Sequence, residues 1–129
     1  MAVDFNLEGK IALVTGASGG LGRHFAGVLA DAGAIVAVAA RRMDKITETV
    51  ADIEAAGGKA LGIEMDVTDK ASITQAFEAV AEEAGTVTVL VNNAGVAVGK
   101  AALDLSEEDW DWVLDTNLKG AWMVAQEAA

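Results

Sequence analysis

The feature that most constrains the fold of this chain is a regular alternation between short apolar runs and longer segments with helical periodicity. Apolar runs of strand length occupy residues 10–15, 34–40, 60–66 and 87–92, and apolar residues recur every three or four positions after each of them. Strands that are apolar throughout are typical of a parallel sheet covered on both faces. Because right-handed crossovers join parallel neighbours, the pattern predicts an α/β fold with strand order 3-2-1-4 and helices on both faces of the sheet.

Four helices are expected between and after these strands. The periodicity places them at residues 20–32, 44–56 and 72–84, each ended by a glycine, and from Ser106 to the end of the chain. Ser106 with Asp109 is similar to a capping box, although Asp replaces the usual Glu or Gln, and residues 99–105 are expected to form a loop. The apolar faces of the four helices are predicted to contain Leu21, Phe25, Val28 and Leu29; Ile46, Val50 and Ile53; Ile73, Phe77, Val80 and Ala81; and Trp110, Val113, Leu114, Leu118, Ala121, Trp122 and Ala125.

Composition excludes several classes of protein. The 129 residues suffice for one domain spanning residues 1–129, and a hydrophobic content of 53% is too high for a disordered chain. A net charge of −11 argues against nucleic acid or an anionic membrane as a partner. Because the chain has no cysteine, we expect no thiolate metal site, no metal and a cytoplasmic location. We also expect no targeting segment and no membrane-spanning segment.

A glycine-rich sequence, Thr15 to Gly22 (TGASGGLG), joins the first strand to the first helix. Free backbone N–H groups and the positive helix end favour a pyrophosphate at such a point, so we expect a Rossmann-type nucleotide site. Gly16 can form the turn, Gly20 leaves the space beneath the phosphates free of a Cβ, and Gly22 allows close packing of helix on sheet. A flexible connection without a ligand is the alternative. The spacing Gly-x3-Gly-x-Gly differs from the commoner dinucleotide pattern and lacks the Lys of a P-loop.

The end of the second strand indicates which dinucleotide is bound. A carboxylate is expected there if the ribose 2′-hydroxyl is recognised, but the chain has Ala40, Arg41 and Arg42. Two guanidinium groups suit the 2′-phosphate of NADP in charge and in bidentate geometry. NADP is therefore favoured over NAD as the cofactor. The alternative is a solvated arginine pair that caps the strand end.

Together these features resemble the short-chain dehydrogenases/reductases, and most of all their bacterial 3-oxoacyl-carrier-protein reductase-like group. The resemblance covers practically the whole chain and rests on TGASGGLG, on Asp66-Val67 after the third strand, on Asn92-Asn93-Ala94-Gly95 after the fourth, and on Asn117-Leu118-Lys119-Gly120 in the last helix. It implies that the cofactor-binding residues are Gly16, Ser18, Gly19, Gly20, Leu21 and Gly22 around the phosphates; Arg41, supported by Arg42, at the 2′-phosphate; Asp66 and Val67 at the adenine; and Asn93 and Gly95 beside the adenosine ribose.

Polar side chains in these motifs also have simpler interpretations. Asp66 can accept a hydrogen bond from the adenine amino group, or it can cap the turn before the third helix. Asn92 and Asn93 can satisfy backbone groups at the strand end. Asn117 falls on an apolar helical stripe, where an unpaired amide would cost about 1–3 kcal/mol, so it must have a partner. In the resembling family an Asn at this position is catalytic, because it belongs to an Asn-Ser-Tyr-Lys tetrad and holds a water in the proton relay; an Asn satisfied by local backbone is the alternative.

The sequence departs from that family in its catalytic residues. The Ser, Tyr and Lys of the tetrad would lie beyond the last helix, and the chain contains no tyrosine, so the family's reaction cannot run as written on this polypeptide alone. We expect the N-terminal, cofactor-binding half of an NADP-dependent oxidoreductase, truncated after the fourth helix. The complete enzyme would move hydride between the nicotinamide and a small carbonyl or alcohol substrate. The alternative is a nucleotide-binding or self-associating half-fold with no catalysis of its own.

Self-association is a further expectation. If the sheet ends at the fourth strand, residues 87–91 leave N–H and C=O groups unpaired along one edge. The last helix would also expose Trp110, Leu114, Leu118 and Trp122, which is more apolar surface than a soluble monomer usually shows. We therefore predict a homodimer or a larger assembly.

Overall fold

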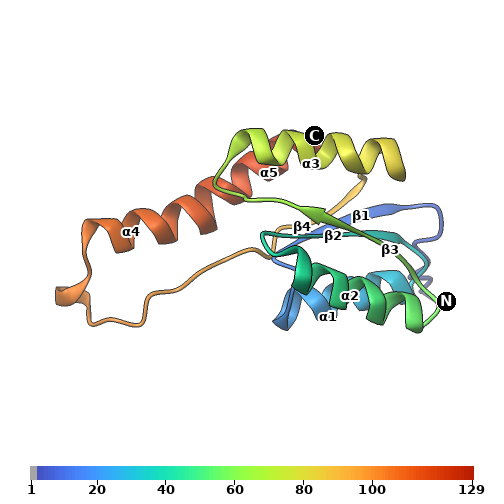
Figure 1. Cartoon of the computed structure of the whole chain (residues 1–129), viewed down its shortest axis with the longest axis horizontal. Helices are drawn as coiled ribbons and strands as arrows, with labels where there is room; N and C mark the ends of the chain where they lie inside the picture. The colour runs from blue at the N-terminus through green and yellow to red at the C-terminus, as the bar shows by residue number, and fades with distance from the viewer. Residues whose placement is uncertain (1–2) are drawn as a thin grey trace.

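The computed structural model describes residues 3–129 and shows a four-stranded parallel sheet with helices on both faces (Figure 1). The strand order is β3-β2-β1-β4, which confirms the predicted order 3-2-1-4. The elements in chain order are β1 (Ile11–Thr15), α1 (Gly20–Asp31), β2 (Ile35–Ala40), α2 (Met43–Ala55), β3 (Lys59–Glu64), α3 (Lys70–Glu83), β4 (Val89–Val91), the 3₁₀ turn η1 (Ala102–Asp104), α4 (Glu107–Leu114), the π-helical segment η2 (Asp115–Gly120) and α5 (Ala121–Ala128).

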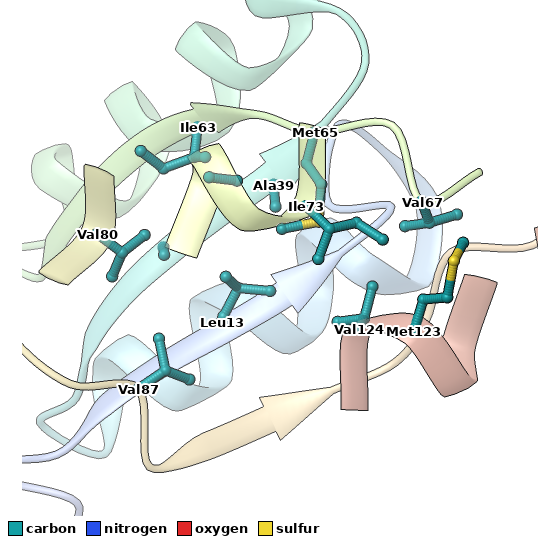
Figure 2. Close-up of a cluster of buried hydrophobic side chains, with 12 residues drawn as sticks. Leu13, Ala39, Ile63, Met65, Val67, Ile73, Val80, Val87, Met123 and Val124 are labelled. Carbon is teal, nitrogen blue, oxygen red and sulfur yellow. The ribbon is translucent and has the colours of Figure 1, made fainter. Parts of the chain in front are cut away.

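Two apolar layers hold the helices on the sheet. Figure 1 shows α1 and α2 on one face and α3 with α5 on the other. Successive strand residues point to opposite faces, so Leu13 of β1 packs under α3 and α5, whereas its neighbours Ala12 and Val14 pack against α1 and α2. Figure 2 shows the first of these layers, in which Val80 of α3 and Val124 of α5 surround Leu13. The central strands β1 and β2 are thus buried on both faces, as their continuous apolar character predicted, whereas β3 and β4 are only partly buried.

Several element boundaries differ from the predictions. Strand β3 ends at Glu64, so Asp66 lies two residues beyond it, and β4 covers only Val89–Val91 rather than residues 87–92. Helix α3 begins at Lys70 because Asp69 is its N-cap and accepts hydrogen bonds from the backbone N–H groups of residues 71 and 72. The predicted continuous last helix contains a π-helical segment between α4 and α5, which periodicity does not reveal.

The buried face of α1 was predicted only in part: Phe25 and Leu29 are partly buried and pack against the core, as predicted. Leu21 and Val28 are exposed, and the residues that face the sheet are Gly22, Ala26 and Ala30. Small side chains occupy this face because the helix approaches the sheet closely, and size rather than hydrophobicity therefore decides which residues are buried. Ala81 of α3 was misplaced in the same way, since Ala76 is the buried alanine of that helix.

The segment from Val96 to Leu114 stands away from the sheet as an arm formed by a loop and α4 (Figure 1). The capping box predicted at Ser106 and Asp109 is present, and Lys100 donates to Asp109 at 2.7 Å, which ties the loop to the start of α4. The apolar stripe is largely exposed, as predicted for this helix: Trp110 is 62%, Leu118 67% and Trp122 57% exposed. Within residues 3–129, no helix has the length and apolar character required to cross a membrane.

Candidate functional site

A cleft of about 300 Å³ opens at the carboxyl ends of the strands. In an open parallel sheet this is where ligands bind, beside the point at which the strand order reverses. Its walls come from the loops after β1, β2, β3 and β4 and from the arm. The lining residues are Thr15, Gly16, Ser18, Ala39, Ala40, Arg41, Arg42, Met65, Asp66, Val67, Thr68, Ala94, Gly95, Val96, Trp112 and Thr116.

The loop after β1 is shaped by glycines that leave no room for a side chain. Gly16 has φ = +62°, and a Cβ there would lie 2.9 Å from the Cα of Ala94. A Cβ at Gly22 would collide with the carbonyl oxygen of Gly16 and with the amide nitrogen of Asn93. Both glycines therefore allow backbone to approach backbone, as predicted for the turn and for the helix contact.

Side chains from distant segments fix the same loop. The Thr15 hydroxyl accepts hydrogen bonds from the backbone N–H groups of Asn93 (3.0 Å) and Ala94 (2.9 Å). In return, the Asn93 amide donates to the carbonyl oxygens of Thr15 and Gly16, both at 3.2 Å. The buried Thr49 hydroxyl of α2 donates to the carbonyl oxygen of Ala17 at 3.0 Å. Asn93 thus makes the strand-end contacts of its simpler interpretation, and it does not line the cleft.

The start of α1 is open to solvent above this fixed base. Gly20 has φ = +54°, and a Cβ there would meet no atom within 4 Å. The N-cap Gly19 and the exposed Leu21 belong to the same rim. Among residues 3–129, no side chain caps this helix end, so its first N–H groups point to a space that an anion can enter. Gly19, Gly20, Leu21 and Gly22 border this space rather than line the cleft itself.

The two arginines after β2 differ in their partners. Arg42 donates to Asp44 at 2.9 Å and precedes α2 as its N-cap residue. Within residues 3–129, Arg41 makes no hydrogen bond or ion pair with another side chain, and it lines the cleft. The simpler interpretation, a solvated residue at the strand end, therefore fits Arg42 better than Arg41. Of the two arginines that line the cleft, Arg41 is therefore the one without a side-chain partner in the described part of the chain.

Asp66 lines the same cleft as Arg41. Its Oδ1 accepts hydrogen bonds from the Thr68 hydroxyl at 2.7 Å and from the Thr68 backbone N–H at 2.9 Å. These bonds, together with the positive charge of Arg41, hold the pKa of Asp66 below its usual range. The carboxylate caps the turn before α3, as its simpler interpretation predicted, although the helix N-cap is Asp69. Its other oxygen makes no hydrogen bond among residues 3–129.

Asn117 lies in the π-helical segment, and its partner is backbone, as the second interpretation proposed. Its Oδ1 accepts from the Val96 N–H at 2.8 Å, and its Nδ2 donates to the Val96 carbonyl at 2.9 Å. The residue is exposed rather than buried on the apolar stripe, which corrects the prediction. Asn117 does not line the cleft but fixes the neighbouring segment of Gly95 and Val96, which does.

Sequence reasoning missed several residues of this region. Thr15 and Thr49 were not singled out because a threonine at a strand end or inside a helix has no distinctive pattern. Trp112 of α4 and Thr116 of η2 line the cleft, and a helical periodicity cannot show that this region reaches so far. A buried hydroxyl needs a partner, so Thr49, on the buried face of α2, could have been marked as a loop support.

Comparison with known proteins agrees with this geometry. The model of the short chain dehydrogenase family matches residues 10–129. This chain belongs to that family. Among curated relatives it is 41% identical over 123 residues to D-threitol dehydrogenase from Mycolicibacterium smegmatis, covering 95% of this chain and 47% of the relative. It is 39% identical over 121 residues to 3-oxoacyl-(acyl-carrier-protein) reductase from Escherichia coli, covering 94% and 48%.

Solved structures give the same result. A short-chain type dehydrogenase/reductase from Mycobacterium marinum superposes with a TM-score of 0.94 and 41% identity, over 97% of this chain and 51% of that one. A putative short-chain alcohol dehydrogenase from Sinorhizobium meliloti gives 0.92 and 44%, over 98% and 50%. The chain thus spans about half the length of the relatives that it matches, and it corresponds to a dehydrogenase/reductase nucleotide-binding region.

Proposed function

We propose that this chain is the NADP(H)-binding part of an oxidoreductase that transfers hydride between the nicotinamide and a small carbonyl or alcohol substrate. The observation that supports it best is Arg41, a cleft-lining guanidinium without a side-chain partner within residues 3–129. A free guanidinium can accept a phosphate in bidentate geometry. No carboxylate stands at Ala40 or Arg42 to bind a ribose 2′-hydroxyl, which favours NADP over NAD.

The other walls of the cleft fit the same cofactor. The uncapped start of α1 and the open space above Gly20 provide donors and room for a pyrophosphate. The free oxygen of Asp66 can accept a hydrogen bond from the adenine amino group, and Val67 supplies an apolar contact beside it. Ser18 and Gly95 line the space between these two ends.

The bound cofactor would supply the hydride, and the residues of this chain would hold and orient it. Asn117 orients the Gly95–Val96 segment because both ends of its amide are bonded to Val96. Its expected part in a proton relay stays a prediction, as does the expected cytoplasmic location.

A second candidate function is a nucleotide-binding or self-associating module without catalysis. The complete absence of tyrosine favours it for the isolated chain, because the family's acid/base residue is then missing. Both candidates include nucleotide binding and differ in turnover.

Titration calorimetry with NADP and NAD tests the binding proposal, and we expect tighter binding of NADP. Equal affinities for the two would contradict the assignment of Arg41, and binding of neither would contradict the function. NADPH oxidation with a panel of ketones then separates the candidates. Turnover by this chain excludes the module, whereas binding without turnover supports it.

A further inference from the structure

One residue of the loop after β1 is held from two sides by the segment that contains Arg41. The N–H of Ala17 donates to the carbonyl oxygen of Ala39, near the end of β2, at 3.1 Å. The carbonyl oxygen of Ala17 accepts from the hydroxyl of Thr49, in the middle of α2, at 3.0 Å. Arg41 lies between these two contacts along the chain. The two hydrogen bonds therefore close a ring that joins the loop after β1 to the connection between β2 and α2.

The bond from Thr49 to Ala17 is buried, and the carbonyl has no substitute for it. Both residues are fully buried, and among residues 3–129 no other donor reaches the Ala17 carbonyl oxygen. The other acceptor near the Thr49 hydroxyl is the Lys45 carbonyl, one turn earlier in α2, at the longer distance of 3.5 Å. A buried carbonyl that loses its donor is unfavourable, so the hydroxyl is expected to stay on Ala17.

Exposed contacts between α1 and α2 do not replace this bond. The two helices lie side by side on one face of the sheet (Figure 1), and Arg23 of α1 forms ion pairs with Glu48 and Asp52 of α2. All three side chains are at least one-third exposed, and ion pairs in solvent contribute little to stability. A groove of about 270 Å³ also opens between the helices. The Thr49 hydroxyl is therefore the strongest polar link from α2 to the loop.

We propose that Thr49 is a positioning residue for the cofactor, because it holds the loop after β1 and Arg41 at the spacing that one NADP molecule requires. This inference rests on the proposed function, in which the loop binds the pyrophosphate and Arg41 the 2′-phosphate. A ligand that contacts both ends of a site binds more tightly when the two ends are already in place. Without the Thr49 hydroxyl, the loop keeps its bond to Ala39 but is released from α2.

Substitutions at Thr49 separate the hydroxyl from the rest of the side chain. Thr49→Val has nearly the same shape and lacks the donor, whereas Thr49→Ser keeps the donor and lacks a methyl group. Thr47→Val is the matched control, because the exposed Thr47 hydroxyl donates within α2, to the Met43 carbonyl at 2.8 Å. Urea denaturation measures the stability of each variant separately from its affinity.

Two ligands distinguish positioning from a general loss of structure. NADP contacts both ends of the proposed site, whereas adenosine 2′-monophosphate contacts the ribose end alone. We expect Thr49→Val to raise the NADP dissociation constant about three- to tenfold, as the loss of one hydrogen bond predicts. The dissociation constant for adenosine 2′-monophosphate, followed by NMR titration, should stay unchanged. Thr49→Ser should restore most of the NADP affinity, and Thr47→Val should bind both ligands as the original chain does.

Three results would overturn the role of Thr49. They are an unchanged NADP affinity in Thr49→Val, equal losses of affinity for the two ligands, and no recovery in Thr49→Ser. If the original chain binds neither ligand, the proposed function fails and this role fails with it. If the original chain binds both ligands and the variants do not differ from it, only the role of Thr49 fails.

A second variant applies if Thr49→Val does not fold. Thr49→Ala also removes the hydroxyl, and its smaller side chain leaves room for a water molecule at the Ala17 carbonyl. The link from α2 to the loop is still lost, so we expect the same selective loss of NADP affinity. Affinities equal to those of the original chain would overturn the proposal here too.

Discussion

The two ends of the candidate nucleotide cleft are built in different ways. At the phosphate end, the loop after β1 is packed so closely that a Cβ on Gly16 or Gly22 would collide with backbone or with the Asn93 amide. At the ribose end, Arg41 and Asp66 are side chains on loops, with space around them. The first end is made from the backbone and the second from interchangeable side chains. Substitutions at the ribose end are therefore expected to change the preference between NADP and NAD while the fold is retained. Substitutions at the phosphate end are expected to lower the stability of the fold.

The largest effect is expected at Gly22. Gly22→Ala drives a Cβ into the Gly16 carbonyl, and we expect the free energy of unfolding to fall by about 3 kcal/mol, measured by urea denaturation. Gly27→Ala on the same helix is the control, because a Cβ there meets no atom within 4 Å and alanine favours helix by about 1 kcal/mol. Equal stabilities of the two variants would show that the phosphate end is not tightly packed.

Substitutions at Gly20 distinguish backbone strain from steric blocking of the ligand. Its positive φ makes any side chain unfavourable, but the surrounding space is open, so Gly20→Val is expected to remain folded by circular dichroism. We expect NADP binding to weaken by more than about tenfold, because the side chain keeps phosphate from the backbone donors. Gly20→Ala shares the strain with a smaller side chain and should bind better than Gly20→Val. Undiminished binding by the valine variant would place the pyrophosphate elsewhere.

The ribose end is expected to tolerate exchange of side chains. Ala40→Asp combined with Arg41→Ala should reverse the preference from NADP to NAD, because a charged hydrogen bond to phosphate contributes about 1.5–3 kcal/mol. Arg42→Ala should change the preference less, since Asp44 already holds that guanidinium. Titration of each variant with both cofactors is the measurement. If the double variant keeps its relative affinities, Arg41 is not part of the site.

The smallest effect concerns the pKa of Asp66. Thr68 makes the largest contribution to lowering this pKa and Arg41 a smaller one, so Thr68→Val should raise it more than Arg41→Ala does. A lowered folded pKa stabilises the protein above the unfolded value, near 3.9, and this stability is lost as the pH falls through the folded pKa. Carboxyl chemical shifts followed by NMR between pH 2 and 6 would show which of the two variants raises the pKa of Asp66 more. The reverse order would mean that Arg41 contacts Asp66 more directly than the structure indicates.

The sequence predicted the arrangement of the sheet better than the contacts of the helices. Continuous apolar strands that alternate with helices indicate a parallel sheet, and right-handed crossovers leave few strand orders, among them the predicted and observed order 3-2-1-4. Leu21 was wrongly assigned to the buried face of α1 because periodicity detects hydrophobic residues. The residues that are buried against the sheet are the small Gly22, Ala26 and Ala30. Close approach of a helix to a sheet depends on tertiary packing, which a single sequence does not report.

For the site, residues on strand ends could be predicted and their partners could not. Arg41 and Arg42 have the same position in the pattern, yet only the structure shows that Asp44 holds one of them. Asn117 was recognised as needing a partner, but Val96 lies 21 residues away in sequence. The π-helical segment that contains Asn117 has no periodicity of its own, so the sequence did not predict it.

The bonds between Thr15 and Asn93 have a consequence for the order in which the protein matures during synthesis. The two residues are 78 positions apart, so the phosphate loop emerges early but cannot reach its final shape until β4 has been made and has docked beside β1. Such distant contacts form late because long loops must close first. Partial chains that end before Asn93 should therefore be unable to bind nucleotide. Nucleotide binding would then indicate that β4 has docked beside β1.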